Sequence, residues 1–267
     1  MIKYELDNRS LSESTKDLKP LLAKRPPFLF LDRDGTLVPI ADNPKDAILG
    51  AATSKVLRRL SARLSKRVAI VSARGLNMLA TEFDCNQFIL AGNYGLEISF
   101  PSGKKIVHPE AQKALSLLSE VRFDLAQMAE RNARLMLDDH QYSFCLHFHK
   151  VPSEEWPVIY RQINELEQKY CSLQFRALPT SYEIVPAIEW SKASALDKIV
   201  AELSLSAEEF LCMAFGDSSA DEPMFQWVNR HGGLSFNVGG RASANATSTL
   251  DSSSDVIEFL EALLVLK

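Results

Sequence analysis

Two short acidic motifs carry the residues most able to do chemistry in this sequence. The first, Asp32-Arg33-Asp34-Gly35-Thr36-Leu37, directly follows the apolar run at residues 28–31. Its two aspartates could act together, one as a nucleophile and the other as an acid that protonates a leaving oxygen. The alternative is a solvated turn in which an aspartate side chain caps the backbone. In either case Gly35 allows the chain to turn sharply.

The second acidic motif is Gly216-Asp217-Ser218-Ser219-Ala220-Asp221-Glu222, which follows the apolar run at residues 210–215. Asp221 and Glu222 could do no more than cap the helix that comes next. If the two motifs meet in one sheet, however, their carboxylates form a convergent set of oxygens. Mg²⁺ prefers such ligands together with the oxygens of a substrate phosphate.

A third set of residues could hold phosphoryl oxygens. Ser72 follows the apolar run at residues 68–71, and Lys192 begins a predicted helix. Taken alone, they are a helix-capping hydroxyl and a surface lysine. An aspartate that approaches a phosphate dianion is repelled, so a metal ion and a lysine must offset the charge. Asp34 would then have to stay protonated, with a pKa above its solution value of about 3.9, to protonate the leaving alkoxide.

The elements that must position these residues predict a doubly wound, mainly parallel α/β sheet. Continuous apolar runs of strand length are typical of strands that are buried on both faces. Amphipathic helical patterns separate them. The strands are predicted at residues 28–31, 68–71, 88–91, 210–215 and 233–236, and the helices at 53–64, 76–83, 192–203, 221–228 and 255–266. All three sets of candidates lie after strands, where open α/β sheets bind their ligands.

The α/β pattern is interrupted by a segment of different character. It contains a helical pattern at 109–131, strand-like runs at 135–137 and 143–148, a helix at 156–169 and short strands near 173–175 and 182–185. We expect an α+β cap domain at residues 108–180, inserted into a Rossmann-like core at 26–107 and 181–267. Residues 1–25 form an N-terminal extension. The connections near 103–109 and 180–186 are the expected hinges.

Composition restricts the class of protein. The chain has 267 residues, of which 46% are hydrophobic and 24% charged, as in folded proteins. A net charge of −4 argues against a nucleic-acid or anionic-membrane partner. The four cysteines form no CxxC pair, and there is no apolar leader or run long enough to cross a bilayer. We therefore expect a cytoplasmic protein; its oligomeric state is not predicted.

The order of the motifs DxDGTL, Ser72, Lys192 and GDxxxDE resembles the haloacid dehalogenase superfamily of phosphotransferases. Longer matches are to its trehalose-6-phosphate phosphatase branch, and the resemblance spans about residues 26 to 262. They are DxDGTLVPI at 32–40, VSAR at 71–74, LAGNYGLEI at 90–98, SFxLHF at 143–148, YEIVP at 182–186, GDxxxDExMF at 216–225, VG at 238–239 and DVxxFL at 255–260.

The resemblance implies a Mg²⁺-dependent phosphatase that hydrolyses trehalose 6-phosphate through an aspartyl-phosphate. Asp32 would be the nucleophile and Asp34 the general acid and base. Mg²⁺ would bind the carboxylates of Asp32 and Asp217 and the carbonyl of Asp34, with Asp221 supporting them from behind. The implied phosphate-binding residues are Gly35, Thr36, Ser72 and Lys192, and the implied sugar-binding residues are Glu183, His147, Asn93 and Glu97.

Several positions depart from the family pattern. Arg33 stands where an apolar residue is usual, Tyr94 replaces a histidine, and His140, His149 and Val185 replace cations of the cap. The phosphoryl-transfer residues are retained, so the departures concern the substrate. The alternatives are a phosphatase of another glycosyl phosphate, such as a sucrose or glucosylglycerate phosphate, and a catalytically silent sugar-phosphate-binding domain. If the two histidines gain charge as the pH falls from about 7.5 to 6, KM should fall with it.

Overall fold

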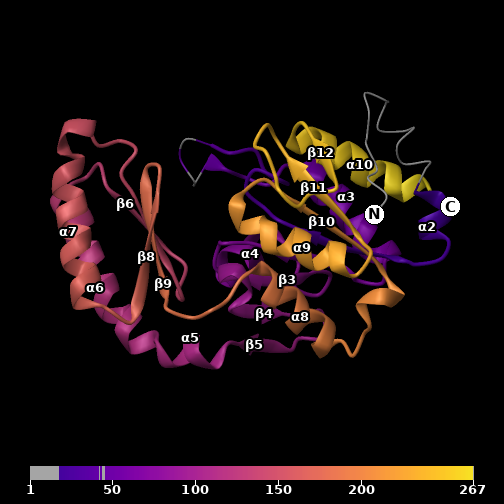
Figure 1. Ribbon diagram of the computed structural model, residues 1–267, viewed down its shortest axis with the longest axis horizontal. Coiled ribbons are helices and arrows are strands. Elements are labelled where there is room, and N and C mark those ends of the chain that lie inside the picture. Colours follow the sequence, from indigo (N-terminus) through magenta and orange to yellow (C-terminus); the bar gives the residue numbers. More distant parts are fainter. Residues whose placement is uncertain (1–17, 42, 44–45, 267) are drawn as a thin grey trace.

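The larger part of the molecule is built on an eight-stranded sheet (Figure 1). The computed structural model describes residues 18–41, 43 and 46–266, so most of the N-terminal extension lies outside the described residues. The strand order is β12 (Ser248–Leu250), β11 (Leu234–Val238), β10 (Leu211–Gly216), β1 (Pro27–Leu31), β2 (Val68–Val71), β3 (Ile89–Gly92), β4 (Glu97–Ser99) and β5 (Lys105–Val107). The strands from β12 to β3 are parallel, and β4 and β5 are antiparallel additions. The predicted fold class is confirmed.

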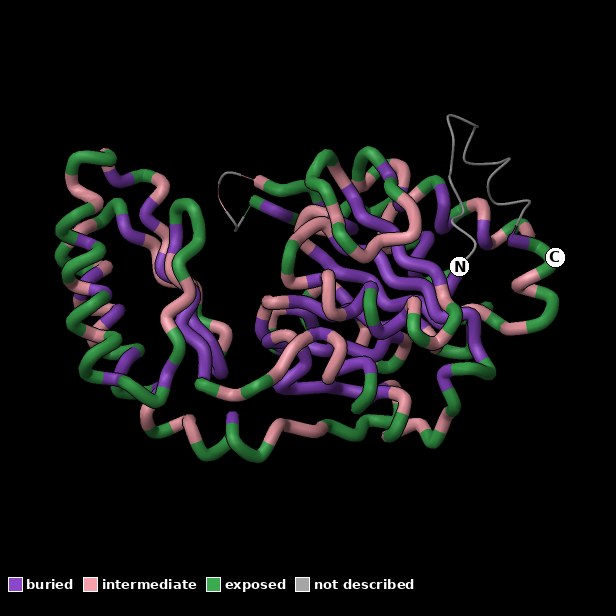
Figure 2. The backbone as a smooth tube through the Cα atoms, viewed as in Figure 1, coloured by how far each residue is buried: buried purple, intermediate pink, exposed green. Residues whose placement is uncertain are grey.

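Helices cover both faces of this sheet. One face holds α3 (Ala51–Arg63), α4 (Leu76–Glu82) and α10 (Ser253–Val265), and the other holds α8 (Lys192–Glu202) and α9 (Glu222–Arg230). A short helix, α2 (Lys19–Leu22), precedes β1. Because side chains alternate along a strand, Leu29 and Leu31 pack into one apolar cluster and Phe28 and Phe30 into the other. The strands are therefore buried on both sides (Figure 2).

A second, four-stranded antiparallel sheet forms a smaller layer, which we call the cap (Figure 1). Its order is β6 (Met136–Asp139), β7 (Phe144–His147), β9 (Ser181–Pro186) and β8 (Leu173–Leu178), and its helices are α5 (Pro109–Lys113), α6 (Leu115–Arg131) and α7 (Trp156–Lys169). Phe144 and Leu146 of β7 pack against these helices. The alternate residues Cys145 and His147 project from the other face of the sheet, which is turned toward the core (Figure 1).

The structure differs from the sequence prediction in several details. β9 pairs with β7 and β8, so the cap sheet extends to Pro186. The domain boundary expected at residue 180 therefore lies just before a strand of the cap, and the hinge expected at 180–186 coincides with that strand. The helix expected at 109–131 is divided at Ala114. The sequence did not reveal β4, β5 or β12, because three residues are too few to show a hydrophobic period.

Among the described residues, no helix is long and apolar enough to span a membrane.

Candidate active site

The predicted catalytic residues converge at the carboxyl ends of neighbouring parallel strands. Asp32 follows β1, Ser72 follows β2 and Asp217 follows β10. The in-register pairing of Leu31 with Phe215 and with Ile70 brings these strand ends to one edge of the sheet. They line a cavity of about 760 Å³, which also receives Lys192 from α8 and residues from the cap. The two acidic motifs therefore meet at one edge of the sheet, together with Ser72 and Lys192.

Lys192 lies at the floor of this cavity and is only 2% exposed. Its ammonium group donates to Asp32 Oδ1 at 2.5 Å and to Asp221 Oδ1 at 2.6 Å. Burial alone would lower the pKa of Lys192, but the charges of the two carboxylates outweigh it and raise the pKa above its usual value. The lysine is therefore a permanent cation beside Asp32, and not the surface residue that its type alone would indicate.

A cluster of three carboxylates can hold a metal ion. Oxygen atoms of Asp32, Asp217 and Asp221 all lie within 4.8 Å of one another. Burial, followed by the charge of Asp221, raises the pKa of Asp217 to about 6. Burial and the charges of Asp221 and Asp217 also raise the pKa of Asp32 above its usual value, although Lys192 acts in the opposite direction. The three carboxylates thus carry more negative charge than Lys192 alone offsets, and a hard divalent cation such as Mg²⁺ fits their oxygen donors.

Gly35 allows Asp217 to approach the loop that carries Asp32. Its φ is +80°, and a Cβ atom there would lie 2.0 Å from Asp217 Oδ2. Any side chain at this position would push the carboxylate away, in addition to straining the backbone. We infer that Gly35 contributes space for the metal-binding carboxylate. It is not among the described residues that line the cavity.

Asp221 supports the second acidic loop from behind. Its Oδ2 accepts hydrogen bonds from the backbone N–H groups of Asp217 at 3.1 Å and Ser218 at 2.9 Å, while its Oδ1 accepts from Lys192. The carboxylate is fully buried, so these bonds replace its hydration. Both oxygens of Asp221 are therefore engaged within the protein, whereas Lys192 engages one oxygen of Asp32. Direct binding of the metal by Asp32 and Asp217, with Asp221 behind them, stays a prediction.

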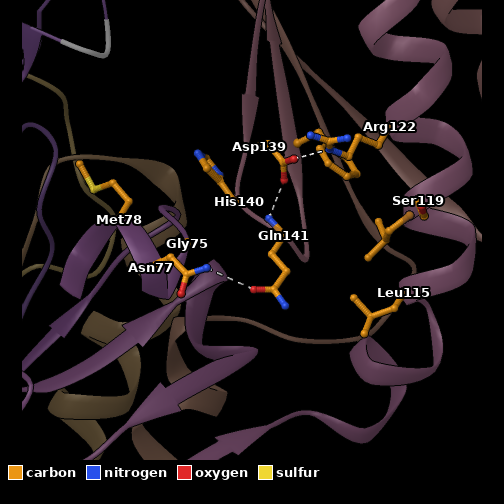
Figure 3. Close-up of a pocket in the computed structure, with 11 residues that line it drawn as sticks. Gly75, Asn77, Met78, Leu115, Ser119, Arg122, Asp139, His140 and Gln141 are labelled. Carbon is orange, nitrogen blue, oxygen red and sulfur yellow. Dashed lines mark hydrogen bonds and ion pairs between the residues drawn. The ribbon is translucent and has the colours of Figure 1, made fainter. Parts of the chain in front are cut away.

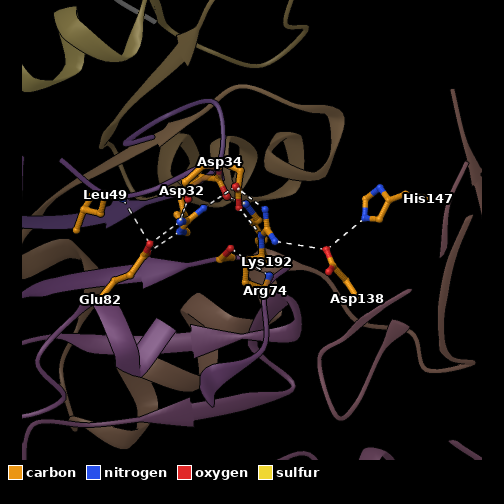
Figure 4. Close-up of polar contacts among 11 residues, drawn as sticks. Asp32, Asp34, Leu49, Arg74, Glu82, Asp138, His147 and Lys192 are labelled. Atoms are coloured by element: carbon orange, nitrogen blue, oxygen red, sulfur yellow. Dashed lines mark hydrogen bonds and ion pairs between the residues drawn. The ribbon is translucent and has the colours of Figure 1, made fainter. Parts of the chain in front are cut away.

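Asp34 is held by two arginines (Figure 4). Its Oδ1 accepts from Arg33 Nη1 at 2.6 Å and from Arg74 Nη2 at 2.9 Å, and its Oδ2 accepts from Arg74 Nε at 3.0 Å. Burial by itself would raise the pKa of Asp34, but the hydrogen bonds and charges of Arg74 and Arg33 outweigh it and lower the pKa. The expectation of a raised pKa is therefore wrong for this conformation, because the sequence did not reveal the two guanidinium groups.

The remaining phosphate-binding candidates are placed unequally. Ser72 is buried at the wall of the cavity, and its Oγ accepts from the Arg74 N–H at 3.1 Å, so it both caps the loop and faces the site. Thr36 is fully buried, does not line the cavity, and its Oγ1 has no hydrogen-bond partner among the described residues. Of these two hydroxyls, only that of Ser72 is in position to meet a phosphate.

The cap contributes a charged chain of contacts to the site. His147 lines the cavity, and its Nε2 lies 3.3 Å from Asp138 Oδ2, which in turn lies 3.6 Å from Arg74 Nη1 (Figure 4). Glu183 lies behind the cavity lining, where its Oε1 accepts from Tyr94 Oη at 2.7 Å. Burial raises the pKa of Glu183. Tyr94 itself reaches the cavity, so it stands between Glu183 and a ligand.

Asn93 and Glu97 join the core to the cap and do not line the catalytic cavity within the described part of the chain. Asn93 Nδ2 donates to Glu97 Oε1 at 2.7 Å and to the carbonyl of His140 at 2.9 Å. Glu97 Oε1 also accepts from the N–H of Leu76, and Ser143 Oγ donates to Asn93 Oδ1. The expected contact of these two residues with a sugar is not what this geometry offers.

His140 faces a second cavity between core and cap, of about 510 Å³ (Figure 3). Its walls include Asn77 and Met78 from the core and Arg122 from α6. Burial, with a further effect from the charge of Arg74, lowers the pKa of His140 to about 4. This histidine therefore stays neutral between pH 6 and 7.5, and the expectation that it regains charge there is wrong. His149 does line the catalytic cavity, whereas Val185 is buried.

Three residues that the sequence analysis did not assign shape the site. Arg74 is the last residue of the VSAR motif, so its position gave a signal that could have been used. Glu82 and Asp138 lie in α4 and β6, and no local pattern separates them from ordinary surface acids. Their roles depend on contacts between segments that are distant in sequence.

Comparison with known proteins agrees with the site. Residues 30–256 match the family described as trehalose-phosphatase. The chain is 25% identical over 259 residues to probable trehalose-phosphate phosphatase G of Arabidopsis thaliana, with 88% of this chain and 68% of that protein covered. The C-terminal domain of the C. albicans trehalose-6-phosphate phosphatase superposes with a TM-score of 0.74 at 20% identity, with 93% and 97% of the two chains covered. A haloacid dehalogenase-like hydrolase from Bacteroides thetaiotaomicron gives a TM-score of 0.59 at 19% identity, with 88% and 98% covered. The chain therefore belongs to the trehalose-phosphatase family, whose members are phosphoric monoester hydrolases.

Proposed function

We propose that this protein hydrolyses trehalose 6-phosphate to trehalose and phosphate in the cavity between core and cap. The observation that carries the proposal is the cluster of Asp32, Lys192 and Asp217 at the wall of that cavity, with the buried Asp221 behind them. A volume of about 760 Å³ is in the range of cavities that bind small molecules. The cap supplies the opposite wall, where the non-reacting part of the substrate would lie.

Asp32 is the proposed nucleophile. A carboxylate oxygen of Asp32 forms a bond to phosphorus while the ester bond between phosphorus and the sugar oxygen breaks, which leaves an aspartyl-phosphate. Lys192 contacts the same carboxylate and offsets its repulsion from the phosphate dianion. Bound Mg²⁺, held by Asp32, Asp217 and the carbonyl of Asp34, would supply further charge stabilisation to the phosphoryl oxygens.

Asp34 is the proposed proton carrier. To protonate the departing sugar alkoxide, Asp34 must enter the reaction as the neutral acid, which requires relief from the arginines that lower its pKa in this conformation. The carboxylate left behind then takes a proton from the water that hydrolyses the aspartyl-phosphate, which restores the acid. For this exchange Arg74 must release at least one oxygen of Asp34, since Arg74 now contacts both. Ser72 can donate its hydroxyl to a phosphoryl oxygen from the adjacent strand end.

The residues that would face the sugar support the choice of trehalose 6-phosphate as substrate less directly than the core residues support phosphoryl transfer. His147, His149 and Tyr94 offer hydrogen-bonding groups to sugar hydroxyls. Tyr94 and His149 depart from the family pattern, so another glycosyl phosphate is the second candidate substrate.

We also propose that the enzyme works in a reducing compartment such as the cytoplasm, since its four cysteines are unpaired.

The test is phosphate release by the purified protein with Mg²⁺. The substrates are trehalose 6-phosphate, sucrose 6-phosphate, glucose 6-phosphate and an aryl phosphate, and Asp32→Asn is the control. We expect the highest kcat/KM with trehalose 6-phosphate and no release by the control. If another sugar phosphate is better by more than about tenfold, roughly 1.4 kcal/mol of transition-state preference, the second candidate replaces the first. If none of the four releases phosphate, the proposed activity is refuted, and binding of the same sugar phosphates then tests the alternative of a silent binding domain.

A further inference from the structure

Arg33 is a fully buried arginine between the two aspartates of the first motif. Its side chain is 0% exposed. Nε and Nη2 donate to the two carboxylate oxygens of Glu82 on α4, at 2.7 and 2.6 Å, and Nη2 also donates to the carbonyl of Ala47 at 2.5 Å. Nη1 then donates to Asp34 Oδ1 at 2.6 Å. The guanidinium thus joins Asp34 to Glu82 and Ala47 of the core.

Arg33 and Arg74 hold Asp34 in different ways. Arg74 lines the cavity and lies 3.6 Å from Asp138 of the cap, so both a ligand and the cap can contact it directly. Arg33 lines neither of the two cavities described above, within the described residues, and its partners Glu82 and Ala47 belong to the core. Of the two cations on Asp34, Arg33 is the one that, among the described residues, does not itself line the cavity or contact the cap, although its partner Ala47 does line the cavity.

Stability does not explain a charged residue at this position. The attraction between the charges of a buried ion pair often does no more than offset the free energy lost when both groups leave water. A protein with an apolar pair of similar volume at the same place is often equally stable. The guanidinium geometry, in contrast, lets one group grip Glu82 with two nitrogens and present the third nitrogen to Asp34. What the arginine adds is directional control of the Asp34 carboxylate.

We propose that Arg33, anchored by Glu82, is a positioning residue that keeps Asp34 aimed at the leaving oxygen when Arg74 moves away. The inference rests on the proposed phosphatase function. Without Arg33, the Asp34 side chain retains only Arg74, and it follows that residue toward the cap. Proton transfer to a sugar alkoxide then suffers, because it requires a donor within hydrogen-bond reach of the leaving oxygen. An aryl phosphate needs little protonation of its leaving group, so it is much less affected.

The experiment compares four variants on trehalose 6-phosphate and on an aryl phosphate, with urea unfolding of each. Arg33→Met removes the group, Glu82→Gln weakens its anchor, and the double variant Arg33→Met/Glu82→Met removes both charges together. The control is Arg25→Met at the other end of β1, where Arg25 donates to the backbone carbonyls of Gly232 and His231 at 2.8 and 2.9 Å. Arg25 is also an arginine that anchors the chain, but far from the site.

We expect Arg33→Met to lower kcat on the sugar phosphate by about tenfold, to leave KM unchanged and to lower the aryl phosphate rate by less than about threefold. Glu82→Gln should also lower kcat more on the sugar phosphate than on the aryl phosphate, with a smaller difference between the two substrates. The double variant should regain stability relative to Arg33→Met but not the sugar phosphate rate.

Three results would overturn the inference. They are recovery of the sugar phosphate rate in the double variant, equal losses on both substrates, and the same split in the Arg25→Met control. A wild-type protein that hydrolyses neither substrate would instead remove the proposed function itself.

Discussion

Asp217 carries a negative charge that the fold leaves uncompensated until a cation binds. Its pKa is raised from 3.8 to about 6, mainly by burial and then by the charge of Asp221. One pKa unit corresponds to about 1.4 kcal/mol, so ionising this group costs the folded state up to about 3 kcal/mol. Because the folded protein binds this proton more tightly than the unfolded chain does, the contribution to stability is lost as the pH rises from about 4 to about 6.

The perturbation that tests this reasoning is Asp217→Asn, measured by urea unfolding in a chelator. Asparagine has nearly the same shape and no charge to bury. The variant should therefore be more stable than the wild type at about pH 7, by up to about 3 kcal/mol, and nearly equal to it at about pH 4. Added Mg²⁺ should stabilise the wild type, by about 2.7 kcal/mol at a hundred times its Kd, and the variant far less.

Two results would refute this account of Asp217. One is a variant that is less stable than the wild type at neutral pH in the chelator. The other is an equal response of both proteins to Mg²⁺. The exposed residue Asp251 provides the matched control, since Asp251→Asn removes a charge that is already hydrated and should change neither curve.

Three further predictions concern other parts of the site. Gly35→Ala should abolish turnover and the Mg²⁺-induced rise in Tm, because the new methyl group would lie 2.0 Å from Asp217 Oδ2; normal activity would contradict this. Lys192→Met should cost about 3–5 kcal/mol in urea unfolding, since it leaves Asp32 and Asp221 buried without their cation, and a loss below about 1 kcal/mol would show that the pair is not coupled as described. Glu97→Gln should lower stability but leave kcat/KM for trehalose 6-phosphate within about twofold, because Glu97 bonds to Asn93 and the Leu76 N–H behind the cavity; a loss above about tenfold would place it against the substrate.

The sequence by itself determined the framework and the positions of the main reactive groups. Buried strands show as continuous apolar runs, and β1, β2 and β10 were located within a residue or two. Parallel strands end at a common edge, so the convergence of Asp32, Ser72 and Asp217 followed from their positions after those runs. These inferences succeeded because periodicity and strand ends are local properties of the chain.

Only the tertiary structure decided the state and the neighbours of those groups. Lys192 reaches Asp32 across 160 residues of sequence, and Arg33 reaches Glu82 across 49. The pKa of Asp34 is lowered and not raised, because Arg74 arrives from another strand end. The hydrophobic pattern of a sequence indicates that a side chain is buried. The pKa of that side chain, however, depends on which charged groups from other segments lie within a few ångströms of it. That information exists only once the chain has folded.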